Sequence, residues 1–172
     1  DLKGVKLRTM KVPAHVDTFA ALGANPTPMN FGEVYSALQQ GVIDGQENPI
    51  ALIDSQRFYE VQKHVSLTSH VFTTYIPVIS QSFFNGLSSK NQALLLDSME
   101  KAEAYQQDLV NSEQAAQLEK IKKSGTQVVV LSTEQLQLFV DKTESVRSKY
   151  RTTVGEEAYD AWAAAVKSAS GN

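Results

Sequence analysis

The side chains with the most chemical capacity gather in one short polar turn. Residues 44–48 read Asp-Gly-Gln-Glu-Asn, so the carboxylates of Asp44 and Glu47 lie close to the Asn48 amide. Two such carboxylates could act as the acid and the base of a small hydrolase. Carboxylates in this position more often build a turn and cap the next helix, because a helix N-terminus favours negative charge. We therefore expect Asp44, Gln46 and Glu47 to be structural, and we expect no enzymatic activity.

The other residues that could support metal chemistry are three histidines. His15, His64 and His70 lie at separations that match no metal-ligand motif, so we interpret them as ordinary surface or hinge histidines. The sequence contains no cysteine, which excludes disulfides, thiolate metal sites and cysteine nucleophiles. We expect no metal site and no cofactor.

Composition places the chain among ordinary globular proteins. It has 172 residues, of which 42% are hydrophobic and 20% charged, enough for one core but too few for two large domains. With a net charge of −3, the chain has no excess of basic residues for binding the phosphates of nucleic acid. No apolar run approaches the roughly 18 residues that a membrane helix needs.

The polar turn follows a predicted amphipathic helix over residues 30–41. Asn30 is suited to cap this helix, and Glu33 stands three positions later, as in a reciprocal capping box. Gly41 favours the end of the helix. The apolar face is formed by Phe31, Val34 and Leu38.

Three further elements precede that helix. The sequence predicts a half-buried strand over residues 5–10, a short helix over 14–24 and a proline-stiffened extended connection over 25–29. In the strand, alternation places Leu7 on the core side and Arg8 on the other side, so Arg8 is predicted to project away from the core. A single arginine in a strand is most often solvated or paired at the surface.

The elements after the turn are mostly helical. Pro49 fixes the start of the next helix, because proline is tolerated at the first helical position. A long helix is expected from a cap at Ser88 or Ser89, with a kink or a bridging role. Its apolar stripe is formed by Leu95, Met99, Ala102, Leu109 and Ala116. The predicted elements are a helix over 49–59, strands over 64–68 and 70–80, the long helix to about 124, a buried strand over 127–131, a helix opened by the capping box of Ser132 and Gln135 and running to about 150, and a last helix after Gly155.

Four segments in order resemble the solute-binding receptors of tripartite ATP-independent periplasmic (TRAP) transporters, the DctP family. They are GVKLRTM, LGANPTPM, GEVYSALQQGVIDGQENP and RFYEVQKHVSLTSH, and the resemblance is close over residues 2–80. It implies an α/β fold like that of periplasmic binding proteins, with a mixed sheet flanked by helices plus a long bridging helix. It also implies a periplasmic receptor that hands organic acids to a membrane permease. Such receptors carry an N-terminal lobe ahead of the first strand, so we expect this chain to be a C-terminal portion.

The resemblance also implies five ligand-binding residues. Arg8 stands where the family clamps the ligand carboxylate, a role that suits a planar guanidinium fork. Asn48 matches the amide that binds the carboxylate from the opposite side. Phe31 matches an aromatic that packs on the ligand, although it could equally fasten its helix to the core. Lys11 replaces a polar or acidic residue, and is either a contact to a more anionic ligand or simply exposed. Tyr75 falls where some members of the family place a polar side chain that faces the ligand, so it is a weaker candidate for ligand binding.

The predicted division is a ligand-binding lobe over residues 1–63, hinge strands over 64–84, and a helical part over 85–172 that packs on the lobes. A competing hypothesis is an isolated or domain-swapped fragment, which pairs its exposed strand edges with a second copy as a homodimer. A hydrolase that uses Asp44 and Glu47 is the weakest hypothesis.

Overall fold

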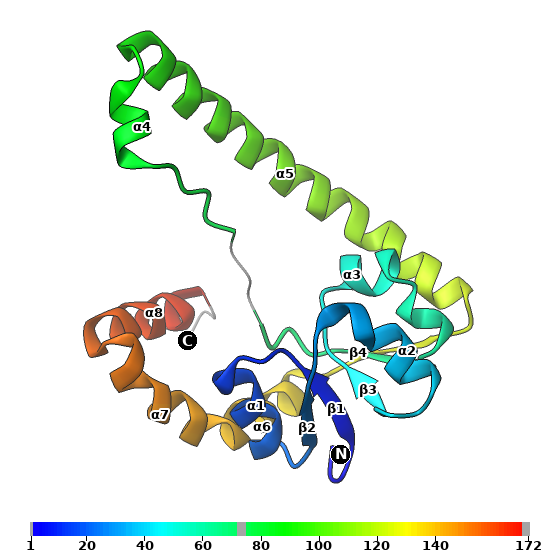
Figure 1. Cartoon of the computed structure of the whole chain (residues 1–172). Helices are drawn as coiled ribbons and strands as arrows, with labels where there is room; N and C mark the ends of the chain where they lie inside the picture. The colour runs from blue at the N-terminus through cyan, green and yellow to red at the C-terminus, as the bar shows by residue number, and fades with distance from the viewer. Residues whose placement is uncertain (1, 72–74, 170–172) are drawn as a thin grey trace.

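Two small parallel sheets organise the computed structural model, which describes residues 2–71 and 75–169 (Figure 1). The strands are β1 Lys6–Thr9, β2 Asn25–Pro28, β3 Gly45–Gln46, β4 His64–Leu67 and β5 Gln127–Val130. One sheet has the order β2-β1-β3, and the other joins β4 to β5. Every strand pairing among the described residues is parallel, so the expected mixed sheet is corrected to parallel sheets.

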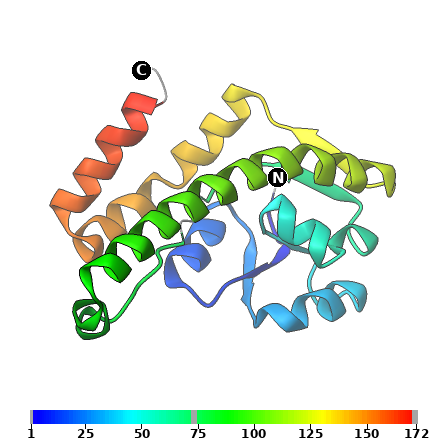
Figure 2. The same cartoon turned by 90° about the horizontal axis from the view of Figure 1, so that it is seen from above.

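Helices surround the sheets and extend beyond them. They are α1 Pro13–Ala21, η1 Phe31–Glu33, α2 Val34–Gln39, α3 Ile50–Ser55, η2 Phe58–Glu60, α4 Gln81–Gly86, α5 Ser89–Lys123, α6 Thr133–Lys142, α7 Glu144–Val154 and α8 Glu156–Ala169. Helices α7 and α8 lie at the end of the molecule opposite α2 and α3 (Figures 1 and 2). The C-terminal end of α5 lies against α3, and its N-terminal end reaches α4, well away from the sheets (Figure 1).

Two apolar clusters hold the sheets and their helices together. One lies under the three-stranded sheet and consists of Leu7, Phe19, Leu22 and Ala24. The other joins α2, α3, η2, β4 and the end of α5, and consists of Val34, Ala37, Leu38, Ile43, Ile53, Phe58, Val65 and Ile121. The second cluster contains residues that precede and residues that follow the polar segment 44–48 in the sequence. It therefore fixes the position of that segment.

Strand β1 is buried on both faces, which corrects the expectation of a half-buried strand. Arg8 does not project away from the core, because only 3% of it is exposed. The segment after β2 covers it, since Arg8 donates hydrogen bonds to the carbonyl oxygen of Met29. The alternation in the sequence could not show this cover, because the covering segment comes from elsewhere in the chain.

The helix predicted over residues 30–41 is shorter than expected and begins differently. Asn30 makes no hydrogen bond to the backbone as a cap; its Nδ2 instead donates to Glu33 Oε1 at 3.1 Å, and the first turn is the 3₁₀ helix η1. The predicted stop at Gly41 is confirmed. Gly41 has a φ of +69°, and the N–H of Val42 donates to the carbonyl of Ala37, which closes the helix end.

The elements after the turn confirm the local signals and correct several lengths. The caps at Ser88 and at Ser132 with Gln135 are present, and Gly155 separates the last two helices. The helix predicted over 49–59 ends at Ser55, because Arg57 takes a left-handed conformation with φ 56°. The helix predicted to reach about 150 is divided into α6 and α7. The strand predicted over 70–80 is absent from residues 70–71 and 75–80, and residues 72–74 lie outside the described part.

Helix α5 leaves most of its apolar side chains exposed. It runs as one helix from Ser89 to Lys123, and among its described residues only Ile121 is buried. From the predicted stripe, Met99 is 40% exposed and Leu109 39% exposed. No helix in the described ranges combines the length and the apolarity that crossing a membrane requires.

Asp17 fastens α7 to α1. Its Oδ2 accepts hydrogen bonds from Lys149 Nζ at 2.6 Å and from Tyr150 OH at 2.7 Å. The bond from Lys149 is the main reason that the pKa of Asp17 is lowered, and the bond from Tyr150 adds to it. A carboxyl with a lowered pKa stabilises the fold above its unfolded pKa, and this contribution is lost as pH falls through its folded pKa.

We therefore expect Asp17→Asn to lower the urea midpoint of unfolding at pH 7. The difference from the unsubstituted protein should shrink as pH falls below about 4, where the carboxyl is protonated in the unfolded chain. Asp97→Asn is the matched control, because Asp97 pairs with Lys101 within α5 and its side chain is 54% exposed. Equal midpoints for Asp17→Asn and the unsubstituted protein at pH 7 would contradict this role.

Candidate functional site

The candidate site lies at the carboxyl edge of the three-stranded sheet. Because β1, β2 and β3 are parallel, the residues that end them meet at one edge. Arg8 comes from β1, Phe31 follows β2, and Glu47 and Asn48 follow β3. Ligands of open parallel sheets bind outside the carboxyl ends of the strands, so this edge is where a binding site is expected.

Arg8 lies on the central strand of this edge as a buried cation. Its Nη2 and Nε donate to the carbonyl oxygen of Met29 at 3.0 and 3.3 Å. Its guanidinium carbon lies 5.8 Å from the centre of the Phe31 ring. Across residues 2–71 and 75–169, no carboxylate forms an ion pair with it. The direct contacts of the guanidinium group given above are thus with neutral groups, and the charge of Glu47 acts on it without an ion pair.

Burial lowers the pKa of Arg8, and the negative charge of Glu47 opposes that shift. An arginine remains protonated in proteins despite such a shift. Taking a cation out of water without a paired anion is unfavourable. An incoming anion would remove that penalty, which is why the arrangement favours anion binding.

Glu47 is held by two histidines that sequence spacing did not connect. Its Oε2 lies 3.1 Å from His70 Nε2, and its Oε1 lies 3.8 Å from His15 Nδ1. The other ring nitrogen of His70 lies 2.7 Å from Thr68 Oγ1. Glu47 therefore contacts distant side chains as well as forming part of the polar segment. His15 and His70, predicted to be ordinary surface or hinge histidines, both lie beside its carboxylate. No motif could have revealed the cluster, because its members come from three distant parts of the chain.

The structure does not favour the hydrolase hypothesis, because strand β3 lies between Asp44 and Glu47 in the chain. Asp44 precedes β3, where its Oδ2 accepts from the backbone N–H of Lys6 at 2.8 Å. Glu47 follows β3 and lies at the opposite end of that short strand. Asp44 is therefore bound to the start of β1, whereas Glu47 contacts His70, so each carboxylate has a different set of partners.

The other predicted site residues lie at different distances from this edge. Asn48 is half-buried, and its Nδ2 donates to Gln46 Oε1 at 2.5 Å. Phe31 packs edge-on against Phe58, with ring centres 6.0 Å apart, and remains 36% exposed. Lys11 is exposed beyond β1, and Tyr75 is 88% exposed in the segment before α4. The structure thus brings Arg8 close to Phe31 and to the residues that follow β3, whereas no contact joins Tyr75 to them among the described residues.

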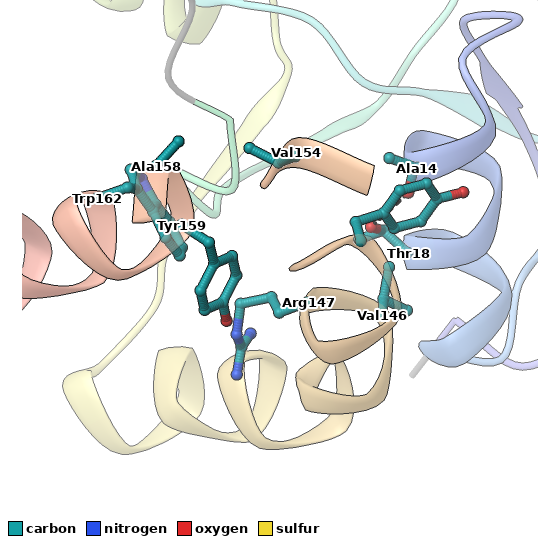
Figure 3. Close-up of a pocket in the computed structure, with 9 residues that line it drawn as sticks. Ala14, Thr18, Val146, Arg147, Val154, Ala158, Tyr159 and Trp162 are labelled. Atoms are coloured by element: carbon teal, nitrogen blue, oxygen red, sulfur yellow. Dashed lines mark hydrogen bonds between the residues drawn. The ribbon is translucent and has the colours of Figure 1, made fainter. Parts of the chain in front are cut away.

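Two hollows in the described part of the surface lie elsewhere. A cavity of about 260 Å³ opens between α1, α7 and α8, with Val146, Tyr159 and Trp162 among its lining residues (Figure 3). A more polar hollow of about 460 Å³ lies between η2 and the start of β5. Neither of these two hollows is lined by Arg8. Within the described part of the chain, no group of three acidic, histidine or cysteine residues is placed to hold a metal ion.

Comparison with known proteins identifies the family. The sequence model described as "Bacterial extracellular solute-binding protein, family 7", or DctP, matches residues 1–153. The chain belongs to this family. Members of the DctP family are solute-binding receptors and not enzymes, which confirms both the resemblance and the expected absence of catalysis.

Three relatives of known name or structure share this family. The ectoine-binding periplasmic protein TeaA of Halomonas elongata is 39% identical over 159 residues, which is 91% of this chain and 47% of TeaA. The 2,3-diketo-L-gulonate-binding periplasmic protein YiaO of Escherichia coli is 42% identical over 129 residues, which is 75% of this chain and 39% of YiaO. A TRAP periplasmic solute-binding protein from Shewanella oneidensis, solved with bound succinate, aligns with a TM-score of 0.83 at 32% identity, over 94% of this chain and 53% of its own.

These relatives confirm the α/β fold of periplasmic binding proteins and the extracytoplasmic setting that the resemblance implied. The chain spans about half the length of the relatives that it matches. The matched half contains the whole carboxyl edge described above.

Proposed function

We propose that this chain is the carboxylate-binding part of a TRAP receptor that delivers a small organic acid to a membrane permease. The observation that carries the proposal is Arg8, a buried cation at the carboxyl edge of a parallel sheet that forms no ion pair with any residue the structure describes. The ligand in this proposal is a small carboxylate such as a C4-dicarboxylate or a sugar acid. The relatives that bind succinate and 2,3-diketo-L-gulonate support that class.

Each predicted residue has a part in this proposal. Arg8 grips the carboxylate, and the Asn48 amide donates to the same group from across the edge. The exposed face of Phe31 packs on the body of the ligand. Lys11 and Tyr75 lie further out and contact the ligand only at its periphery.

The division of the chain follows the same proposal. Residues 1–63 form the binding lobe, residues 64–84 are the hinge, and residues 85–172 pack on both lobes. Ligand binding favours the closed arrangement of lobes, because it can shift an equilibrium only toward the state that it binds better. The permease recognises that closed arrangement.

Thermal unfolding of the full-length protein with a panel of solutes tests the proposal. The panel consists of succinate, 2,3-diketo-L-gulonate and ectoine, with uncharged succinamide as the control matched to succinate. A ligand at about 100 times its dissociation constant stabilises the folded state by about 2.7 kcal/mol, which raises the melting temperature measurably. We expect an acid to raise it and succinamide not to. Equal effects of succinate and succinamide, with no response to the other acids, would reject carboxylate binding.

A self-associating fragment is the second candidate, and the exposed apolar side chains of α5 favour it. Leu94 and Leu96 are 59% and 60% exposed, and Tyr105 is 69% exposed. Burying such surface against a second copy is favourable. Sedimentation of residues 1–172 distinguishes the cases, because a monomer across the micromolar range contradicts a domain-swapped homodimer.

A further inference from the structure

Gln46 is connected to both of the side chains to which the proposed function assigns the carboxylate. It is the register partner of Arg8 where β3 pairs with β1, and its side chain is hydrogen-bonded to Asn48. We infer that Gln46 is a positioning residue, which holds the Asn48 amide on the same face of the sheet as Arg8 so that one carboxylate meets both groups. The ligand part of this inference rests on the proposed function. The hold of Gln46 on Asn48 does not.

The parallel register places the side chains of Gln46 and Arg8 on one face of the three-stranded sheet. Arg8 pairs with Gln46, and Leu7 pairs with Gly45. Successive side chains of a strand point to opposite faces, so neighbours in register share a face. Gly45 supports this independently, because a Cβ atom at that position would lie 3.2 Å from Leu7 Cδ1, within the core. Gln46, the next residue, therefore leaves the sheet on the side of Arg8.

The hydrogen bond between Gln46 and Asn48 holds the Asn48 amide in one orientation. Asn48 Nδ2 donates to Gln46 Oε1 at 2.5 Å, and both residues are half-buried. A side-chain amide nitrogen carries two N–H groups, so this bond uses one and leaves the other for a ligand. Gln46 belongs to β3, whereas Asn48 follows that strand, so the bond ties a residue beyond the strand to the sheet. Ordering the amide before the ligand arrives lowers the entropic cost of binding.

The neutral amide of Gln46 also suits a position next to a cation. It accepts a hydrogen bond from Asn48 without placing a negative charge beside Arg8, which forms no ion pair within residues 2–71 and 75–169. A glutamate would accept the same hydrogen bond but would add a carboxylate in register with Arg8, and that carboxylate would compete with a bound anion. Substitution can therefore separate the two properties: methionine removes the acceptor, and glutamate keeps the acceptor and adds the charge.

The first test needs no ligand. The NMR signals of the Asn48 Nδ2 protons, assigned by their loss in Asn48→Ala, report the exchange of these protons with water in the full-length protein. We expect exchange to be about threefold to tenfold faster in Gln46→Met, the range for one lost hydrogen bond, and to stay slow in Gln46→Glu. Gln81→Met is the matched control, because Gln81 forms the same kind of amide pair with Asn85 on the exposed surface of α4. Equal exchange in Gln46→Met and the unsubstituted protein overturns the inference.

The second test measures the affinity for succinate by calorimetry. Gln46→Met should weaken binding by about threefold to tenfold, because the Asn48 amide is no longer held in place. In an Asn48→Ala background, the same substitution should weaken binding by less than about twofold, because the group that Gln46 positions is already absent. Gln46→Glu should weaken binding by about a hundredfold, since its carboxylate repels the ligand. Gln81→Met should bind succinate like the unsubstituted protein.

The outcomes distinguish this inference from the proposed function. Two results overturn the inference and leave the proposed function standing: equal succinate affinity in Gln46→Met and the unsubstituted protein, or an undiminished effect of Gln46→Met in the Asn48→Ala background. Faster Asn48 exchange in Gln46→Met, with no panel acid bound, supports the hold of Gln46 on Asn48 and rejects the proposed function. If Gln46→Met does not fold, Gln46→Ala replaces it with the same expected results, because alanine also removes the acceptor.

Discussion

Arg8→Ala is expected to weaken carboxylate binding by about tenfold to several thousandfold in the full-length protein. A hydrogen bond to a charged group contributes about 1.5–3 kcal/mol, and truncating one partner of a buried charged pair costs about 2–5 kcal/mol. At about 1.4 kcal/mol for each factor of ten, these energies give the stated range. The loss should be large here because Arg8 is 3% exposed and forms no ion pair within residues 2–71 and 75–169, which leaves its guanidinium group for the ligand carboxylate. Calorimetry with succinate, or with whichever panel acid binds, measures the change.

Arg8→Lys tests the contribution of the planar guanidinium group separately from that of its positive charge. Lysine keeps the cation but presents a point charge, so we expect a loss smaller than that of Arg8→Ala. Arg57→Lys is the matched control, since the Arg57 side chain is 66% exposed and pairs with Glu60. The assigned role would be refuted by an Arg8→Ala protein that folds and binds the acid with unchanged affinity.

The sequence predicted the ends of helices well, because their signals are local. The glycine stop at Gly41 and the caps at Ser88 and Ser132 depend on a few neighbouring residues, and all three are present. The polar turn predicted over residues 44–48 was wrong in part, because Gly45–Gln46 pairs with β1 as strand β3. The position of Arg8 in a strand was also local, but its burial was not. That burial depends on Met29, which reaches Arg8 only because β1 and β2 pair in parallel.

The Glu47 cluster shows why part of the site could not be predicted. His15 belongs to the first turn of α1, and His70 follows β4, so neither is a sequence neighbour of Glu47. Their convergence results from the strand order β2-β1-β3 and from the path of the chain after β4. Spacing rules detect ligands that share one helix or loop, and this cluster shares neither.

The long helix shows a different limit. Its caps and its length were predictable, because helix signals act over a few residues. The exposure of Met99 and Leu109 was not, because an apolar stripe predicts a buried face without naming what covers it. Burial of the apolar stripe of α5 depends on another element that packs against it, and the sequence of α5 does not specify that element.

Phe58→Ala is the substitution expected to cost the most stability. Phe58 is 1% exposed and lies in the cluster that joins α2, α3, β4 and the end of α5. Removing a buried phenylalanine ring costs about 3–5 kcal/mol, from lost apolar burial and from the cavity left behind. Whole domains are stable by only about 5–15 kcal/mol, so this is a large share of the total. Urea unfolding followed by circular dichroism measures the difference.

Phe83→Ala is the matched control, because Phe83 on α4 is 59% exposed and its loss should stay within about 0.5 kcal/mol. The Phe58 substitution should also reach the site, because Phe31 rests edge-on against Phe58 and lies over the Arg8 guanidinium. Phe58→Leu fills most of the cavity that Phe58→Ala leaves but does not restore the edge of the ring. Compared with Phe58→Ala, it should therefore restore more of the free energy of unfolding than of the affinity for the carboxylate ligand. A loss of the free energy of unfolding and of the ligand affinity in the same proportion in Phe58→Ala and Phe58→Leu would show that Phe58 does not position the Phe31 ring.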